Sequence, residues 1–101
     1  FISNMELKQV ELDFVNLSEF LIYPNPAKAS TNISFDINND CKVEVKVFDL
    51  TGKLLDVPFS SDLYTGYHNF DWNTSTVEKG IYIIKFFVNE KFLSSQRLVL
   101  Q

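Results

Sequence analysis

Apolar and polar residues alternate with a period of two along most of the chain, and this alternation restricts the chain to β-structure. Residues 32–37 and 42–47 each place an apolar side chain at every second position. Successive side chains of a strand point to opposite faces, so each segment acquires one apolar and one polar face. No window shows the capped, roughly 3.6-residue periodicity of an amphipathic helix. The sequence therefore predicts an all-β fold without significant helix.

Turn-forming residues divide this pattern into short segments. Asn38-Asn39-Asp40 predicts a hairpin loop, because Asn and Asp tolerate positive φ. Asp49 to Gly52 predicts a second hairpin, with a type I turn closed by Gly52 in a left-handed conformation. Pro58 indicates an edge strand or a strand end. Residues 60–62 and 73–79 are predicted loops, and the predicted strands cover residues 33–37, 43–47, 53–59, 67–72, 80–89 and 92–101.

The segment from Gly80 to Asn89 is apolar at both odd and even positions. Such a strand is covered on both faces, which predicts a central place in a sheet. About seven short strands in a chain with 46% hydrophobic residues are typical of an Ig-like antiparallel β-sandwich. A single sheet of this size leaves one apolar face in water, whereas two packed sheets bury both. A length of 101 residues suits one domain.

The first twenty residues have a less regular pattern. Their alternation slips by one residue near Gln9-Val10, which predicts a bulge or two short strands. Residues 1–20 are therefore either a packed N-terminal strand or a linker from the preceding region, and residues 21–101 form a C-terminal domain. Because the chain begins with Phe1 and lacks an initiating Met, we expect a larger protein to precede it.

Charge and composition exclude two classes of partner. A formal net charge of −4 gives no electrostatic attraction to phosphate backbones, so no nucleic-acid binding is predicted. No apolar run approaches the ~18–20 residues of a membrane helix, so no membrane insertion is predicted. The single cysteine, Cys41, excludes an internal disulfide, and its place at the start of an apolar alternation favours a small core residue.

The polar residues offer little for catalysis or metal binding. One histidine, His68, and one cysteine supply too few ligands for a zinc site and no partners for a catalytic triad. His68 shares a predicted strand face with Phe70 and Trp72, which favours packing. The acidic clusters at 36–40 and 71–73 lack the glycine and spacing of a calcium loop, so we interpret them as turn formers. We therefore predict no catalytic residue, no metal, no cofactor and no enzyme activity.

Four aromatic residues leave a binding role open, namely Tyr64, Tyr67, Trp72 and Tyr82. A β-sandwich needs aromatic side chains in its core, and the same residues are able to line a sugar-stacking or protein-binding surface. The sequence thus permits a carbohydrate-binding or adhesive module of a secreted enzyme. It also permits a spacer that packs against its neighbour.

An ordered series of short motifs runs from residue 23 to the C-terminus. In chain order they are Tyr23-Pro24-Asn25-Pro26, Asp49 with Gly52 and Lys53, Gly66 with Trp72, Gly80 with Tyr82, and Arg97-Leu98-Val99-Leu100. The series resembles the type A-like C-terminal sorting domain of type IX secretion cargo, in the Por secretion system of Bacteroidetes. The final Gln101 departs from this family, in which many members end in Lys or Arg.

The resemblance implies that the domain is an export signal and not a catalyst. An outer-membrane translocon would recognise it after a larger N-terminal cargo has crossed into the periplasm and folded. A sortase-like protease would then remove the domain by cleavage upstream of Tyr23, leaving the cargo on the cell surface or outside the cell. We further expect the last strand, Gln96 to Gln101, to be the docking edge, to which the machinery adds a strand.

Overall fold

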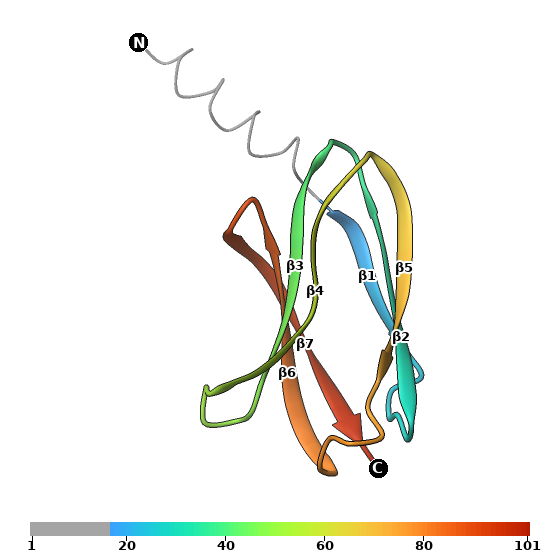
Figure 1. Cartoon of the computed structure of the whole chain (residues 1–101), viewed down its shortest axis with the longest axis vertical. Coiled ribbons are helices and arrows are strands. Elements are labelled where there is room, and N and C mark those ends of the chain that lie inside the picture. The colour runs from blue at the N-terminus through green and yellow to red at the C-terminus, as the bar shows by residue number, and fades with distance from the viewer. Residues whose placement is uncertain (1–16) are drawn as a thin grey trace.

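The structure is a computed structural model that describes residues 17–101. In this part of the chain it contains seven strands and no helix (Figure 1). The irregularity expected near Gln9-Val10 lies outside the described residues. The strands are β1 (Leu17–Tyr23), β2 (Ser30–Ile37), β3 (Cys41–Phe48), β4 (Leu54–Leu63), β5 (Gly66–Asn73), β6 (Gly80–Val88) and β7 (Lys91–Leu100).

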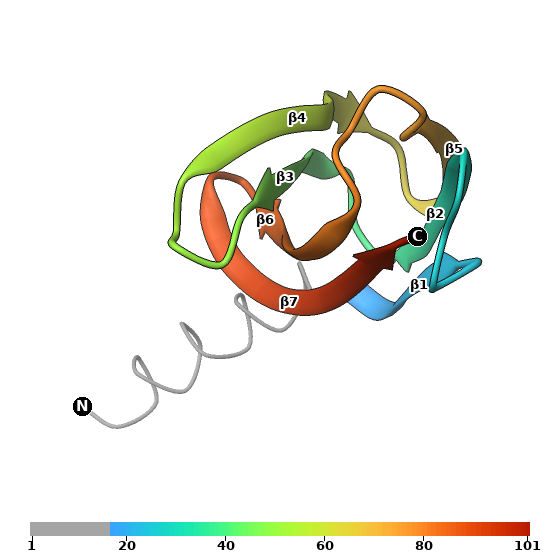
Figure 2. The same cartoon turned by 90° about the horizontal axis from the view of Figure 1, so that it is seen from below.

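The strands form two sheets that lie face to face (Figures 1 and 2). One sheet has the order β1-β2-β5, and the other has the order β4-β3-β6-β7. Neighbouring strands in both sheets are antiparallel. The prediction of a seven-stranded antiparallel β-sandwich is confirmed. β6 lies between β3 and β7, which confirms the central place predicted from its apolar composition.

The core lies between the two sheets and follows from the period of two. Every second side chain of β3 is buried, and the same holds for β6 from Tyr82 onward. The Phe20 ring stacks on Phe86 with 3.3 Å between ring centroids, which joins the first sheet to the second. Burying one such side chain contributes roughly 1.5–3 kcal/mol. The largest fully buried side chains are Phe35, Phe86, Ile33, Ile37, Ile84 and Leu98.

Asn38-Asn39-Asp40 is not a hairpin loop, contrary to the prediction. β2 pairs with β1 and β5, whereas β3 pairs with β4 and β6, so residues 38–40 carry the chain from one sheet to the other. Two strands show the same alternation whether they lie side by side in a sheet or face each other across a core. The pattern therefore indicates both strands but not their relation.

β4 continues to Leu63 and is longer than predicted. Residues 60–62, which were expected to form a loop, pair with residues 42–44 of β3. Pro58 lies where the register between the two strands shifts, and β4 is an edge strand of its sheet. Both circumstances accommodate a proline, because a bulge or an open edge does not require its missing N–H group.

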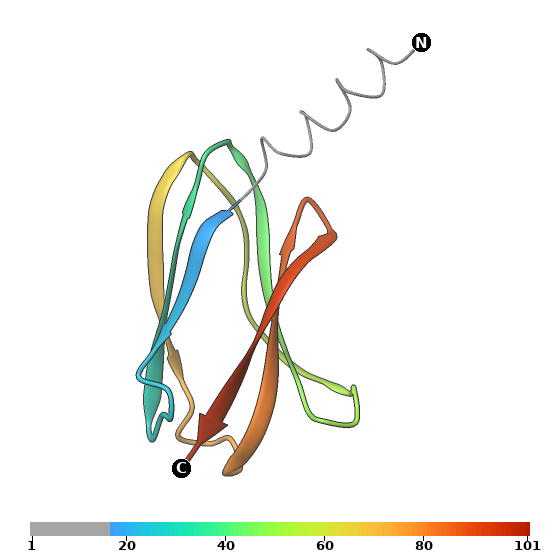
Figure 3. The same ribbon diagram turned by 180° about the vertical axis from the view of Figure 1, so that it is seen from behind.

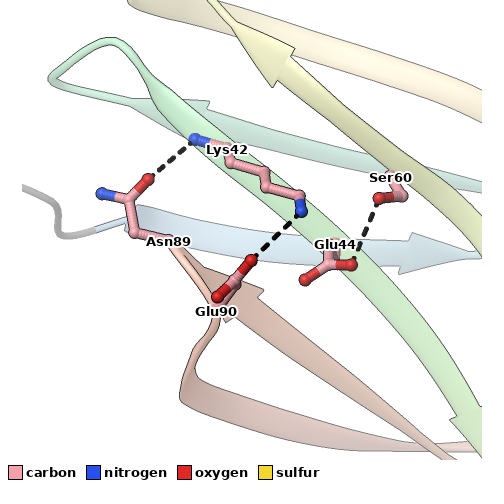
Figure 4. A network of polar contacts seen from close by, with 5 residues as sticks. All are labelled: Lys42, Glu44, Ser60, Asn89 and Glu90. Carbon is pink, nitrogen blue, oxygen red and sulfur yellow. Dashed lines mark hydrogen bonds and ion pairs between the residues drawn. The ribbon is translucent and has the colours of Figure 1, made fainter.

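Polar contacts cover the outer face of β3 near its start (Figure 4). Ser60 Oγ donates a hydrogen bond to Glu44 at 3.2 Å, and Lys42 Nζ forms an ion pair with Glu90 at 3.4 Å. The Lys42 N–H group donates to Asn89 Oδ1 at 3.0 Å. These contacts link β3 to β4 on one side and to the β6–β7 turn on the other. A solvent-exposed ion pair of this kind adds only about 0–1 kcal/mol.

The loops gather at two opposite ends of the sandwich (Figures 1 and 3). At one end lie the β1–β2 segment (24–29), the β3–β4 turn (49–53), the β5–β6 loop (74–79) and Gln101. We call this the C-terminal end. At the opposite end, here called the N-terminal end, lie the start of β1 and the connections at 38–40, 64–65 and 89–90.

Candidate recognition surface

The Tyr-Pro-Asn-Pro segment lies beside the last strand at the C-terminal end. Asn25 Nδ2 donates a hydrogen bond to the Arg97 carbonyl at 2.8 Å, and Asn25 Oδ1 accepts one from the Val99 N–H group at 3.1 Å. A side-chain amide carries one donor and one acceptor group, as a peptide group does. Asn25 therefore provides the bonds that a neighbouring strand would otherwise make with β7.

Ala27 continues this pairing with backbone groups. Its N–H group donates to the Val99 carbonyl at 2.8 Å, and its carbonyl accepts from the Gln101 N–H group at 2.8 Å. Ala27 is fully buried and forms a parallel bridge with Leu100. The Thr31 hydroxyl fixes the segment from the other side by donating to the Pro24 carbonyl at 2.8 Å. We call residues 24–27 the entry clamp, because they hold the outer edge of β7.

The expected strand addition along Gln96–Gln101 is contradicted by this arrangement. Backbone groups of Arg97, Val99 and Gln101 on the outer edge of β7 are already bonded to the entry clamp. Leu98 and Leu100 point into the core, so deleting the last four residues would remove core packing as well as any docking surface. The entry clamp has no period-two pattern, and so nothing local in the sequence indicates a parallel pairing with β7.

The β3–β4 turn is formed as predicted. Asp49 Oδ1 accepts hydrogen bonds from the Thr51 N–H group at 2.9 Å, the Thr51 hydroxyl at 2.6 Å and the Lys53 N–H group at 3.0 Å. Gly52 has a φ of 93°, in the left-handed region that favours glycine. The Thr51 hydroxyl and then the Lys53 backbone stabilise the carboxylate and lower the pKa of Asp49. Three hydrogen bonds thus hold the turn together, and Leu50 at its tip is 66% exposed.

Trp72, Gly80 and Tyr82 come together at the same end. The Trp72 indole donates to Asp56 Oδ2 at 3.2 Å, which links β5 of one sheet to β4 of the other. The Tyr82 hydroxyl donates to the carbonyl of Glu78 in the β5–β6 loop. Gly80 has a φ of 154°, and a Cβ atom there would lie 3.8 Å from the Tyr82 ring. Trp72 and Tyr82 line a cavity of about 400 Å³ with Val47, Leu55, Asp56, Thr76, Val77 and Glu78.

Gly66 is the one residue of the predicted motif set that lies at the N-terminal end. It follows the turn from β4 to β5 with a φ of 131°, and a Cβ atom built on it would contact nothing within 4 Å. Glycine is therefore favoured at this position by the backbone conformation and not by a lack of space for a side chain. The remaining residues of the set lie at or next to the C-terminal end, with the side chains of Leu98 and Leu100 in the core.

The four candidate aromatic residues do not form one surface. Trp72 and Tyr82 are each 7% exposed and belong to the core, whereas Tyr64 is 81% and Tyr67 64% exposed. The exposed pair lies toward the N-terminal end, where β4 turns into β5. A continuous sugar-stacking platform made of all four residues is therefore excluded.

His68 and Cys41 have the packing roles that the sequence favours. His68 Nε2 lies 2.6 Å from the Tyr64 carbonyl, and its ring centroid lies 5.9 Å from that of Phe35. Cys41 is buried, and this burial, together with the nearby Asp40 carboxylate, raises the pKa of the thiol. Its nucleophilic thiolate form is disfavoured accordingly.

Of the two acidic clusters, Asn73 forms a turn as interpreted from the sequence, whereas Asp36 and Asp71 lie in β2 and β5 and Asp40 contacts the distant β4–β5 connection. Asp40 Oδ1 accepts from the Thr65 N–H group at 2.8 Å, and Asn73 Oδ1 accepts from the Ser75 N–H group at 2.9 Å. Among residues 17–101, no group of three or more His, Cys, Asp or Glu side chains is arranged to hold a metal ion. That part of the chain also has no helix long and apolar enough to cross a membrane.

A family model describes most of the chain. The model of the secretion system C-terminal sorting domain matches residues 21–101, which contain nearly all of the described structure. No curated protein matches the chain.

Solved structures share the fold at low sequence identity. Dimeric latent PorU from Porphyromonas gingivalis is similar with a TM-score of 0.70 and 18% identity, over 80% of this chain and 9% of that chain. An immunoglobulin-like protein from Pseudomonas aeruginosa is similar with a TM-score of 0.51 and 9% identity, over 85% of this chain and 92% of that one. The DNA-bound alkylpurine DNA glycosylase AlkC from Pseudomonas fluorescens has a TM-score of 0.59 and 16% identity, over 87% of this chain and 30% of that one. These likenesses confirm the Ig-like fold.

Proposed function

Because the chain belongs to the secretion system C-terminal sorting domain family, we propose that it addresses a larger cargo protein to the type IX outer-membrane translocon. The observation that carries this proposal is the family match over residues 21–101. A sorting domain of this system directs export across the outer membrane. The cargo is attached on the N-terminal side of the domain and ends on the cell surface or in the medium.

The C-terminal end of the sandwich is the proposed contact with the translocon. It carries nearly all of the motif residues, and hydrogen bonds hold each part of it in place. A receptor that transports different cargo proteins has to recognise features of the sorting domain. β1 begins at the opposite end, so the cargo and the translocon contact different ends of the domain.

A sortase-like protease is the second proposed partner, with the domain as its substrate and without catalysis of its own. Proteases cleave segments that are free of secondary structure. β1 is paired with β2 from Leu17 to Tyr23, so the bonds in this stretch are held in a sheet. We therefore place the cleavage on the N-terminal side of Leu17. This position agrees with the cleavage upstream of Tyr23 that the family resemblance implies.

Export of a passenger tests the function directly. Residues 1–101 are fused behind a periplasm-targeted fluorescent protein in a bacterium with an active type IX system. We expect fluorescence outside wild-type cells and retention in the periplasm of a translocon-deficient strain. The fluorescent protein without the domain is the control, and a passenger that leaves the cell equally well in this form would contradict the proposal.

A further inference from the structure

The cavity at the C-terminal end is lined by apolar and acidic groups. Its apolar wall comes from β3, β4 and the β5–β6 loop, and Trp72 and Tyr82 add aromatic atoms. Asp56 and Glu78 are the charged residues of the lining, and both are exposed to solvent. A volume of about 400 Å³ lies within the range of small binding sites, which span roughly 300–1,000 Å³.

Neither carboxylate forms an ion pair within the part of the chain that the structure describes. The ion pair found there joins Lys42 to Glu90, and it lies toward the N-terminal end. Asp56 accepts one hydrogen bond from the Trp72 indole at 3.2 Å and one from the Val57 N–H group at 2.8 Å. A carboxylate has about four acceptor sites, so Asp56 is held in place and still able to accept further donors.

A basic side chain with an apolar stem matches this lining. The guanidinium group of arginine is planar, always charged and less strongly hydrated than an ammonium group. It binds carboxylates through two parallel hydrogen bonds and packs against aromatic rings. Its methylene groups would contact the apolar wall formed in part by Val47, Leu55 and Val77. Aspartate or glutamate side chains would instead be repelled by the two carboxylates.

We propose that this cavity is a socket for an arginine side chain of the export machinery. This inference rests on the proposed function and specifies the chemistry of its recognition surface. A second cavity of about 370 Å³ at the N-terminal end makes a useful contrast, because Lys42 is part of its lining. That cavity is lined in part by a cationic side chain, whereas the charged residues that line the cavity at the C-terminal end are both acidic.

The binding step is tested on residues 1–101 by NMR titration with N-acetyl-arginine-N-methylamide. We expect saturable shifts of the Trp72 indole N–H signal and of the β5–β6 loop amides. Glu78→Gln alone, and together with Asp56→Asn, should weaken this binding about tenfold or more, since each removes a charge while retaining an acceptor oxygen. The control variant Asp36→Asn/Glu44→Gln makes the same charge change on the outer faces of the sheets and should bind like the wild type.

The inference is overturned by any of three results. They are absent shifts, equal shifts with N-acetyl-norleucine-N-methylamide, and unchanged binding in the Glu78→Gln variant. Thermal unfolding of each variant separates a lost site from a lost fold, and Glu78→Gln leaves the carbonyl that holds Tyr82 in place.

Export of the fluorescent fusion separates this inference from the proposed function. If the wild-type domain exports its passenger and Glu78→Gln/Asp56→Asn reduces export severalfold, both are supported. If the wild type and this variant export equally, the socket is wrong and the sorting function stands. If the wild-type domain exports nothing, the proposed function fails, whatever the titration shows.

Discussion

At the residue scale, Asn25 shows how one side chain completes a sheet edge. Its amide makes two hydrogen bonds with the backbone of β7, at Arg97 and Val99. We expect Asn25→Ala to lower the free energy of unfolding by about 1–3 kcal/mol, because each of the two bonds contributes about 0.5–1.5 kcal/mol. Urea denaturation measures the change, with Asn39→Ala at an exposed connection as the control. Equal stability of the two variants would contradict the role assigned to the entry clamp.

Asp49 gives the domain a pH-dependent contribution to stability. Its folded-state pKa is lowered, chiefly by the Thr51 hydroxyl, so the folded state favours the ionised form. The contribution is therefore present above the unfolded-state pKa of about 3.9 and is lost as the pH falls through the folded-state value. We expect the stability difference between the wild type and Asp49→Asn to shrink as the pH falls below about 4. Parallel pH curves for the two proteins, measured by urea denaturation, would refute this.

The same two residues show what was predictable at this scale. The turn at Asp49 was predicted because every group that Asp49 bonds lies within four residues of it. The bonds of Asn25 reach residues 72 and 74 positions further along the chain, beyond any local pattern. The inward direction of Trp72 followed from the alternation, but its hydrogen bond to Asp56 requires the packing of two sheets.

At the element scale, the two faces of β7 differ in burial and so in their contribution to stability. Leu98 and Leu100 are buried in the core, whereas Arg97 is exposed on the outer face. We expect Leu98→Ala to lower the free energy of unfolding by about 2–5 kcal/mol, because it leaves a cavity in the core. Arg97→Ala should change it by no more than about 0.5 kcal/mol, since only the Arg97 backbone bonds the entry clamp. Comparable losses for the two variants in denaturant unfolding would contradict this difference.

Element boundaries followed the sequence better than element partners did. The apolar pattern of the sequence indicated the strand from Gly80 with its correct start and its central place. It could not show that residues 38–40 cross between sheets, because side-by-side and face-to-face strands need the same pattern. It also ended β4 too early, because the polar residues 60–62 are compatible with a loop and with an exposed edge strand.

At the scale of the whole molecule, the antiparallel arrangement collects motifs that are scattered in the sequence. Motifs follow β1 and β3 and form the ends of β5 and β7, and all four of these strands run toward the C-terminal end (Figure 1). Gly80 and Tyr82 begin β6, which starts at that end, whereas Gly66 begins β5 and so lies at the other. Apart from Gly66, the motifs of the series are therefore gathered at one end of the domain only through the fold.

Two exposed apolar residues at opposite ends test whether this surface is the one recognised. Leu50 is 66% exposed at the C-terminal end, and Tyr64 is 81% exposed at the N-terminal end. Leu50→Glu and Tyr64→Glu add the same charge, and each should alter stability by no more than about 0.5 kcal/mol, because neither side chain is buried. We expect Leu50→Glu to reduce export of a fluorescent fusion about tenfold, as for an interface anchor, and Tyr64→Glu to leave export unchanged. Export lost only in Tyr64→Glu would place recognition at the N-terminal end, and thermal unfolding of both variants would show that the difference does not come from misfolding.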